Sequence, residues 1–377
     1  MKSREIVGGR TRGTQEKAPE TWPVTAEHGI TYEHESEKQI HRLRLAATTP
    51  SRGHLREGHH PKGVFGHVVV QDHVEISNFM YQLQELFETE RIDELDATDY
   101  DMLVVEPGFN FSEFPYDTDY LVTQLKTKPN GDERIVLAYI DIGQAEDYRD
   151  YWLSQQVDPA DNWRGPALGT PGNPDFIVST DPDGWAGNYP VAYWDVDWKD
   201  MWVGTGGIIE QIADYGFDGI YLDWVEGYDD DDVIARAAAE STGSGSAPIS
   251  PAVEMIEFIE EMRAKAQTTK SDFLVVAQNA PYLLDTDPAR YASAIDAIAT
   301  EDTWFYGEGD IGWDAAGAGD LTGGDRHSGD YSTANRIAQN EKYLTLGIPV
   351  FTVDYCVSQS NADQVYRDSR PTDSYRW

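Results

Sequence analysis

Residues 216–232 read GFDGIYLDWVEGYDDDD, and this stretch decides the fold. Gly216 is suited to end a helix, and residues 220–222 form a short apolar run typical of a buried parallel strand. The run stops at Asp223, where a carboxylate is costly to bury unless it has a partner or a task. In a parallel α/β barrel the active site lies at this end of the strands. Asp223 is therefore either a cap for the next segment or part of such a site.

The rest of the chain repeats this strand-and-helix pattern. The predicted strands are residues 79–83, 102–105, 135–142, 191–194, 220–222, 273–277, 294–299 and 349–353. Helices are predicted at 117–126, 198–214, from 251 onward and at 333–346, with a lid or binding loop at 163–189 and a loop at 228–250. Eight strands with intervening helices favour a single α/β domain, a (β/α)8 TIM barrel. A doubly wound open sheet is the alternative, but no Gly-rich phosphate turn follows the first strand.

Carboxylate and amide side chains stand at the ends of most predicted strands. They are Glu106, Asp141, Asp195, Asp223, Gln278, Asn279, Glu301 and Asp354, with Gln144 and Glu146 just beyond the third strand. Aromatic residues cluster beside them, among them Tyr81, Tyr139, Trp224, Trp304 and Tyr355. Carboxylates for acid/base work, amides for hydroxyl groups and aromatic rings for sugar faces together predict a carbohydrate site.

The chain is strongly acidic, with 67 Asp and Glu against 29 Lys and Arg and a net charge of −38. Nucleic acid is therefore not an expected partner. Acid spread over the chain resembles proteins of salt-loving organisms, in which salt screens self-repulsion. Binding of a polycationic ligand is an alternative explanation for the acidic net charge.

The sequence offers little to a metal ion or a cofactor, and we expect neither. Cys356 is the only cysteine, so an intrachain disulfide and a Cys-based zinc site are excluded. Only His67, His73 and His327 lie past residue 63, and none ends a strand. No predicted strand holds the Lys that a Schiff-base aldolase needs. The Asp run at 229–232 is predicted to be a solvated acidic loop instead of a calcium site.

Residues 1–63 differ in composition from the remainder of the chain, with 11 Lys and Arg against 8 Glu and no Asp. We expect a disordered leader or a start site placed too far upstream, and a barrel domain over residues 64–377. The start lacks the apolar core of a secretory signal, and no stretch is long and apolar enough to span a membrane. Taken alone, these features predict a cytoplasmic protein.

Several motifs resemble the endo-α-1,4-polygalactosaminidase family, glycoside hydrolase family 114, and its archaeal and bacterial relatives. They are YIDIGQAEDYRDYW, NYPVAYWDVDW, GFDGIYLDWVEGY, VVAQNA, ATEDTWFYG and PVFTVDYC, and they span about residues 79–366 in the family's order. The resemblance implies a (β/α)8 barrel that hydrolyses α-1,4-linked galactosamine-containing polysaccharide outside the cell or at its surface. Asp141 and Gln144 depart from the family, whose members often carry a small residue and Glu there.

The resemblance places the two catalytic carboxylates at Asp223, as nucleophile, and Glu301, as acid/base. The predicted substrate-binding residues are Tyr81, Asp141, Glu146, Asp195, Trp224, Gln278, Asn279, Trp304, Asp354 and Tyr355. Retention and inversion both remain open, as does the division of roles between the two carboxylates. The alternative function is a non-catalytic carbohydrate-binding barrel. We expect a monomer that binds a polysaccharide or oligosaccharide.

Overall fold

The computed structural model describes residues 45–47, 69–70, 74–76, 78–83, 86, 89–108, 117–147, 149, 174–185, 187–243, 247–307, 315–322, 329 and 332–369. The chain divides into two units, Met1–Lys38 and Gln39–Trp377, and every described residue belongs to the second. The architecture is therefore that of the second unit.

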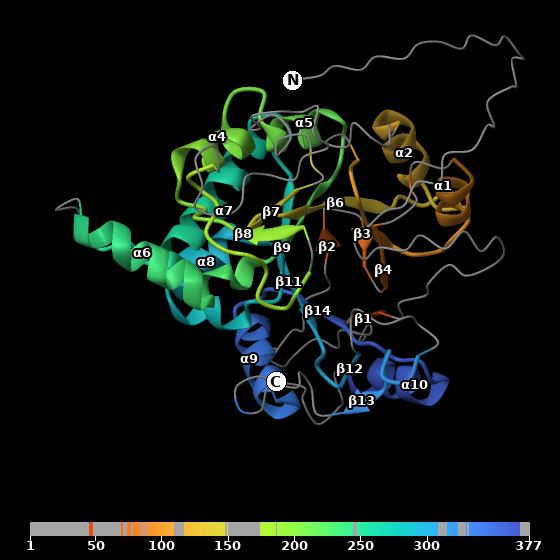
Figure 1. The fold of residues 1–377 in the computed structure, drawn as a ribbon. Helices are drawn as coiled ribbons and strands as arrows, with labels where there is room; N and C mark the ends of the chain where they lie inside the picture. The colour runs from red at the N-terminus through yellow and green to blue at the C-terminus, as the bar shows by residue number, and fades with distance from the viewer. Residues whose placement is uncertain are drawn as a thin grey trace, which may run out of the picture. The chain divides into compact units, whose positions relative to one another are not determined.

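An eight-stranded sheet forms the centre of this unit (Figure 1). Its order is β1-β14-β11-β10-β9-β6-β5-β4, and every neighbouring pair except β1 with β14 is parallel. The strands are β1 Leu45–Ala47, β4 Phe79–Gln82, β5 Met102–Val105, β6 Ile135–Asp141, β9 Gly219–Asp223, β10 Leu274–Gln278, β11 Ala297–Glu301 and β14 Val350–Val353. Helices connect the parallel strands, so the fold is a (β/α)8 barrel of the α/β class, as predicted.

The described helices lie around this sheet. They are α1 Thr89–Asp96, α2 Thr118–Leu125, α4 Val196–Val203, α5 Ile208–Asp214, α6 Asp231–Gly243, α7 Pro251–Gln267, α8 Pro288–Ala294, α9 Thr333–Thr345 and α10 Gln359–Asp368, with short 3-10 helices η3 Val225–Asp229 and η4 Pro281–Asp285. Three two-stranded sheets pair β2 Val69–Val70 with β3 Val74–Glu75, β7 Gln144–Glu146 with β8 Asn188–Pro190, and β12 Phe305–Tyr306 with β13 Leu321–Thr322.

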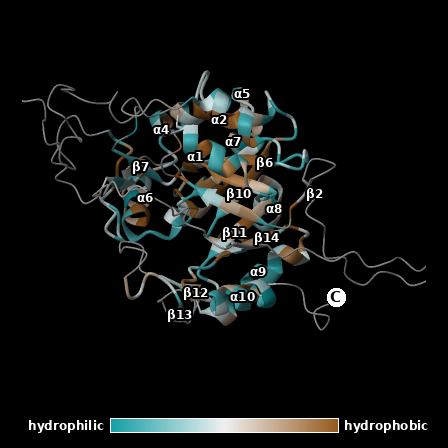
Figure 2. Cartoon of the chain, turned by 90° about the vertical axis from the view of Figure 1, so that its right-hand side faces the viewer, coloured by the Kyte–Doolittle hydropathy of each residue, from teal (hydrophilic) through white to brown (hydrophobic). Residues whose placement is uncertain are grey.

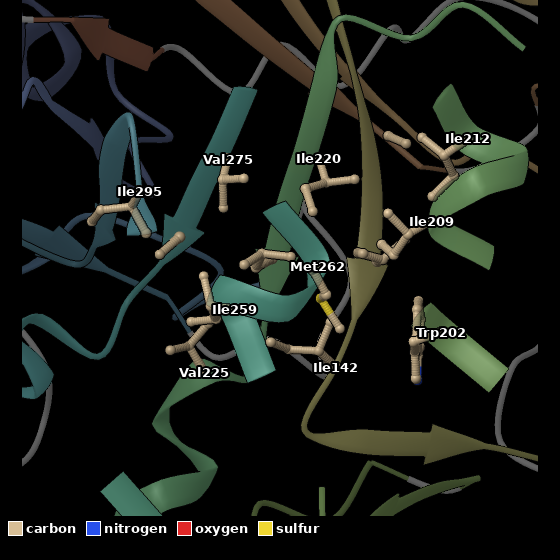
Figure 3. Close-up of a cluster of buried hydrophobic side chains, with 14 of the residues drawn as sticks. Ile142, Trp202, Ile209, Ile212, Ile220, Val225, Ile259, Met262, Val275 and Ile295 are labelled. Atoms are coloured by element: carbon tan, nitrogen blue, oxygen red, sulfur yellow. The ribbon is translucent and has the colours of Figure 1, made fainter. Parts of the chain in front are cut away.

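Two apolar layers fill the barrel because successive side chains of a strand point to opposite faces. In β6, Leu137 and Tyr139 belong to an inner cluster made only of strand residues and Ile76, with Tyr81 and Leu83 packed against it. Val136 and Ala138 belong to an outer cluster that also contains the buried faces of the helices. Figure 3 shows part of the outer layer, where helix residues meet strand residues. Apolar residues gather at the sheet, and hydrophilic ones colour much of the surrounding helices (Figure 2).

The strand predicted at 191–194 is wrong. β6 pairs directly with β9, and Val191 makes only an isolated bridge to Ile177. Pro190 has no N–H to donate to a ladder, and Asp195 already caps α4, so the apolar run is too short to add a strand. Short apolar runs do not by themselves distinguish a strand from a buried turn.

The eighth position of the barrel is filled instead by β1, from the segment predicted to be a disordered leader. β1 pairs antiparallel with β14, with Leu45 opposite Val353, and it approaches β4. Among the described residues no ladder joins β1 to β4. The remainder of residues 1–63 lies outside the described residues.

The loop predicted at 228–250 is also wrong over half its length, because α6 begins at Asp231. The Asp230 side chain accepts the backbone N–H groups of Asp232 and Val233 at 3.0 and 2.9 Å. An acidic first turn suits a helix N-terminus, and the Ala-rich segment after it has high helix propensity. Most of the loop predicted at 163–189 lies outside the described residues, but residues 188–190 form β8.

Candidate active site

The alternation of the strands decides which strand-end residues face the barrel interior. Asp223, Gln278 and Glu301 each lie two positions beyond a member of the inner apolar cluster on their own strand, so they share its face. Asp141 lies directly opposite Asp223 in the β6–β9 ladder. β10 lies between β9 and β11, so the predicted catalytic residues Asp223 and Glu301 face one barrel mouth from strands that are not immediate neighbours.

Asp223 is held at the mouth by two hydrogen bonds. The Tyr139 hydroxyl donates to its Oδ2, and the Trp224 backbone N–H donates to its Oδ1 at 2.7 Å. Burial raises the pKa of Asp223 to about 6, the Tyr139 bond opposes the rise, and the charge of Glu301 adds to it. Above pH 6 the group is mostly ionised, which suits a nucleophile or a base.

Glu301 is fixed by three side chains from two strand ends. The amides of Gln278 and Asn279 donate to its Oε2 at 2.8 and 2.9 Å, and the Tyr355 hydroxyl donates to its Oε1 at 2.7 Å. The Glu301 backbone N–H donates in turn to Asn279 Oδ1 at 2.9 Å. The predicted shell residues Gln278, Asn279 and Tyr355 therefore orient a carboxyl group that is itself only partly buried.

Backbone strain concentrates at these strand ends. Among the described residues five non-glycine residues have positive φ, and four of them directly follow β9, β10 or β11. They are Trp224 at 53°, Asn279 at 53°, Ala280 at 52° and Asp302 at 57°. Left-handed conformations cost free energy in residues with a Cβ and cluster at functional sites. This signal is independent of the side-chain chemistry and indicates the same mouth.

Glu226 is a site residue that the sequence interpretation missed. It lies on η3, three residues after Asp223, and its Oε1 accepts from the Asn279 amide at 3.4 Å. Burial raises the pKa of Glu226 to about 8, and the charges of Asp223 and Glu301 add to the rise. Asp223 ends β9, and Glu226 lies in η3 beyond the left-handed Trp224, so no strand or helix periodicity in the sequence relates the two positions.

The Trp224 indole is packed against backbone. A Cβ on Gly227 would lie 2.6 Å from its Cζ3, and one on Gly143 would lie 2.6 Å from its Cε3. Only glycine allows so close an approach at both positions. Trp224 was predicted to bind substrate; it is only partly buried, and this role stays a prediction.

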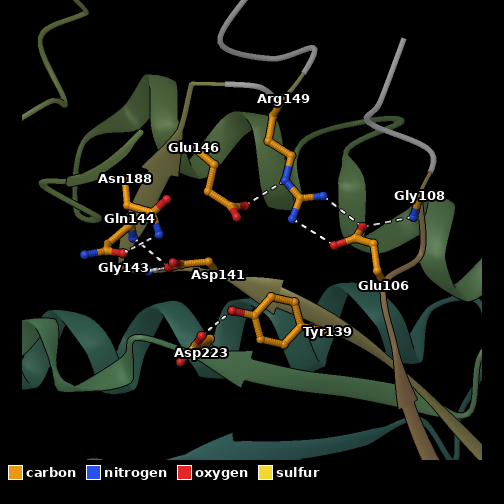
Figure 4. A network of polar contacts seen from close by, with 10 residues as sticks. All are labelled: Glu106, Gly108, Tyr139, Asp141, Gly143, Gln144, Glu146, Arg149, Asn188 and Asp223. Atoms are coloured by element: carbon orange, nitrogen blue, oxygen red, sulfur yellow. Dashed lines mark hydrogen bonds and ion pairs between the residues drawn. The ribbon is translucent and has the colours of Figure 1, made fainter. Parts of the chain in front are cut away.

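Asp141 ends β6 on the same inner face (Figure 4). Its Oδ1 accepts the backbone N–H groups of Gly143 and Gln144 at 3.1 and 2.8 Å. Burial raises the pKa of Asp141 well above its usual range, and the charges of Asp223 and Glu146 add to the rise. Asp141 therefore joins the group of carboxyls at the mouth and also shapes the turn into β7.

Glu146, a predicted substrate-binding residue, lies in an ion-pair network (Figure 4). Arg149 contacts Glu146 Oε2 at 2.7 Å and forms a bidentate pair with Glu106 at 2.8 and 2.9 Å. All three side chains are buried. This arrangement ties the segment after β7 to the end of β5, so Glu106 and Glu146 have structural partners here.

Two further predicted binding residues have structural roles. The Asp354 Oδ1 accepts the backbone N–H groups of Trp304 and Phe305 at 2.6 and 2.9 Å, which holds the turn after β11. Asp195 caps α4 and accepts the Asp197 N–H at 2.9 Å, and it follows no barrel strand. Contact of Asp195, Trp304 and Asp354 with a substrate stays a prediction.

Tyr81 belongs to an aromatic group on the inner face. Its ring centroid lies 5.7 Å from those of Tyr139 and Tyr221, in edge-on contacts. Burial and the charge of Asp223 raise the pKa of Tyr81 well above its usual value, so the hydroxyl stays protonated. These aromatic rings pack together on the inner face of the strands that carry Asp141 and Asp223.

Within the described ranges no three His, Cys, Asp or Glu side chains are placed to hold a metal ion. No helix among these residues is long and apolar enough to cross a membrane.

The sequence is similar to a protein family and to proteins of other organisms. The sequence model of a glycoside-hydrolase family, GH114, matches residues 77–375. An uncharacterized protein of Thermotoga maritima is 28% identical over 231 residues, which is 60% of this chain and 60% of that protein. One of Deinococcus radiodurans is 27% identical over 266 residues, 70% of this chain and 68% of that protein. The chain thus matches less than two thirds of the length of the Thermotoga relative.

Two solved structures are similar to this chain at lower sequence identity. The glycoside hydrolase domain of PelA from Pseudomonas aeruginosa has a TM-score of 0.44 at 13% identity, covering 73% of this chain and 82% of that one. Aspergillus fumigatus Ega3, solved in complex with galactosamine, has a TM-score of 0.38 at 15% identity, covering 59% of this chain and 66% of that one.

Proposed function

Because the chain belongs to glycoside-hydrolase family GH114, we propose that it hydrolyses an α-1,4-linked, galactosamine-containing polysaccharide with Asp223 and Glu301 as the reacting carboxyl groups. The observation that carries this proposal is the placement of both carboxyl groups on the inner face of the barrel, at the ends of β9 and β11, with each held by side-chain hydrogen bonds. The charge of Glu301 raises the pKa of Asp223, although the two residues lie on strands separated by another.

In this proposal Asp223 is the nucleophile. Its Oδ2 and Oδ1 are positioned by Tyr139 and by the Trp224 N–H, so the carboxylate is already oriented before substrate arrives. Ionised above pH 6, it attacks the anomeric carbon as the glycosidic bond breaks.

Glu301 is the acid/base in the same proposal. It gives a proton to the leaving oxygen and then takes one from water, a change of role that microscopic reversibility requires in a retaining enzyme. Gln278, Asn279 and Tyr355 hold the carboxyl group in one orientation throughout. An inverting reaction would use the same two residues with water between them.

The sugar class is inferred from the charge of the mouth. Asp141, Asp223, Glu226 and Glu301 lie there with no ion pair to Lys or Arg among the described residues. A free amine on the substrate would donate charge-assisted hydrogen bonds to the ionised carboxylate and hydrogen bonds to its neighbours. We therefore expect deacetylated galactosaminoglycan to be cleaved faster than its fully N-acetylated form.

The test is release of reducing ends by the purified full chain from a panel of polysaccharides. The panel contains deacetylated and N-acetylated galactosaminoglycan, chitosan and amylose, each at 0.1 and 3 M KCl as roughly low and high screening. Cleavage of the deacetylated galactosaminoglycan alone, or fastest, supports the proposal. Binding to it without release of reducing ends would instead support a non-catalytic carbohydrate-binding barrel.

A further inference from the structure

Glu226 has contacts that the two-carboxylate chemistry does not use. The Asn279 amide nitrogen lies 2.9 Å from Glu301 Oε2 and 3.4 Å from Glu226 Oε1. One amide group thus has two N–H bonds, and each reaches a different carboxyl group. Asn279 is also held by its own backbone N–H, which donates to Ala299 at 2.7 Å.

The second oxygen of Glu226 is in an unusual position. Oε2 is buried and has no hydrogen-bond partner among the described residues. An ionised carboxylate oxygen left without a donor is far costlier to bury than the hydroxyl of a protonated acid. The geometry therefore favours a neutral Glu226 whose carbonyl oxygen faces Asn279.

The charges around Glu226 act in the same direction. In the described part of the chain, the charges of Asp223 on β9 and Glu301 on β11 raise the pKa of Glu226. Glu226 in turn raises the pKa of Tyr221 on β9 and of Tyr291 on α8. All of them are acids, and none offers a positive charge. A third carboxylate beside Asp223 and Glu301 would add repulsion at the point where the reaction needs one charged and one protonated group.

We propose that Glu226 is a positioning residue that works as a neutral carboxylic acid: it anchors the Asn279 amide, and Asn279 in turn fixes Glu301. The burial that raises the pKa of Glu226 to about 8 supports this state. The kinetic part of the proposal rests on the proposed function, whereas the protonation state does not.

The first test measures the protonation state by thermal melting and needs no substrate. Because the folded-state pKa of Glu226 lies above its unfolded value, the folded protein holds this proton longer, and wild type loses stability as pH rises toward 8. Glu226→Gln lacks this titration. The Tm of Glu226→Gln minus that of wild type should therefore rise between pH 5 and pH 8 and then level off.

Glu90→Gln, which changes an exposed residue of α1, is the control and should show a constant Tm difference. A constant difference for Glu226→Gln as well would overturn the proposal. So would failure of Glu226→Gln to fold, because a neutral isostere of a protonated glutamate should occupy the same space.

The second test asks whether Glu226 acts through Asn279. Glu226→Gln keeps an oxygen acceptor, so its kcat should fall by no more than about tenfold. The kcat of Glu226→Ala and that of Asn279→Ala should each fall by about 100-fold. The double variant Glu226→Ala/Asn279→Ala should be no worse than Asn279→Ala alone. If the two single losses of kcat multiplied in the double variant, Glu226 would not act through Asn279. If kcat of Glu226→Gln fell by several orders of magnitude, Glu226 itself would be catalytic.

Discussion

At the scale of single residues, the Tyr139 hydroxyl donates a hydrogen bond to Asp223, the proposed nucleophile. Its hydrogen bond lowers the pKa of Asp223 against the effect of burial. Tyr139→Phe should therefore raise that pKa, and the acidic limb of kcat/KM should move to higher pH. Loss of a hydrogen bond to a charged group should also lower kcat/KM at pH 6 by about 10- to 100-fold.

A pH profile from 4 to 9 measures this effect. Tyr120→Phe is the matched control, since it removes a Tyr–Asp hydrogen bond of 3.1 Å on the exposed face of α2. An unshifted acidic limb in Tyr139→Phe would show that the phenol does not tune Asp223.

The position of Asp223 and Glu301 at the barrel mouth could be predicted from the sequence, because an apolar run that ends near a carboxylate can be recognised without a structure. Glu226 could not be found by that rule, since it stands on a turn beyond its strand. Asp354 follows a barrel strand and yet accepts backbone N–H groups that hold a turn, and Asp195 follows an apolar run that is not a barrel strand. The alternation of inner and outer side chains along a strand distinguishes carboxylates that face the barrel interior from those that do not. To use this alternation, the strand boundaries must be known to within one residue.

At the scale of elements, β1 has a testable role in closing the barrel. It pairs with β14. Without β1, the edge of β14 that does not pair with β11 would have no partner strand in the sheet. A protein that begins at residue 39 retains β1, whereas one that begins at residue 64 lacks it. We expect the shorter protein to lose at least about 5 °C in Tm relative to the longer, or roughly 1–2 kcal/mol.

Melting by circular dichroism compares the two truncated proteins. Equal melting temperatures would show that β1 contributes nothing to stability.

Asp218 joins several elements at the opposite end of the barrel from the site. This buried carboxylate accepts the Val136 N–H at 2.8 Å and pairs with Lys126 at 2.5 Å and Lys270 at 3.3 Å. Asp218→Asn would leave both ammonium groups short of a buried partner, so the free energy of unfolding should fall by about 2–4 kcal/mol.

Urea unfolding measures this loss, and Asp272→Asn is its control. Asp272 also approaches Lys270, at 3.7 Å, but it is 54% exposed, so its substitution should change stability by less than about 1 kcal/mol. Equal effects of the two substitutions would contradict the role given to Asp218.

The elements themselves were predicted where apolar runs were long or fully buried, as in β6 and α7. Residues 191–194 failed because four apolar residues between Pro190 and the cap of α4 suit a packed turn equally well. β1 was missed because an antiparallel strand of three residues carries no periodicity that a sequence window can detect.

At the scale of the whole molecule, the net charge of −38 should make stability depend on salt. Screening shortens from about 30 Å at 0.01 M to about 3 Å at 1 M, so repulsion among surface carboxylates weakens as salt rises. We expect Tm to increase by at least about 5 °C between 0.05 and 3 M KCl.

A parallel series in sucrose separates screening from general exclusion of solute from the protein surface. A Tm that stays constant in KCl, or that rises only as much as it does in sucrose, would contradict adaptation to high salt.

If Asp223 and Glu301 react as a pair, the most direct test is to measure kcat for Asp223→Asn and Glu301→Gln on deacetylated galactosaminoglycan. Both substitutions remove a charge at nearly constant volume, so circular dichroism and Tm should remain close to those of wild type. Each kcat should fall by about 1,000-fold or more, because each variant lacks one of the two groups that the reaction requires. Near-wild-type kcat in either folded variant would contradict the assignment.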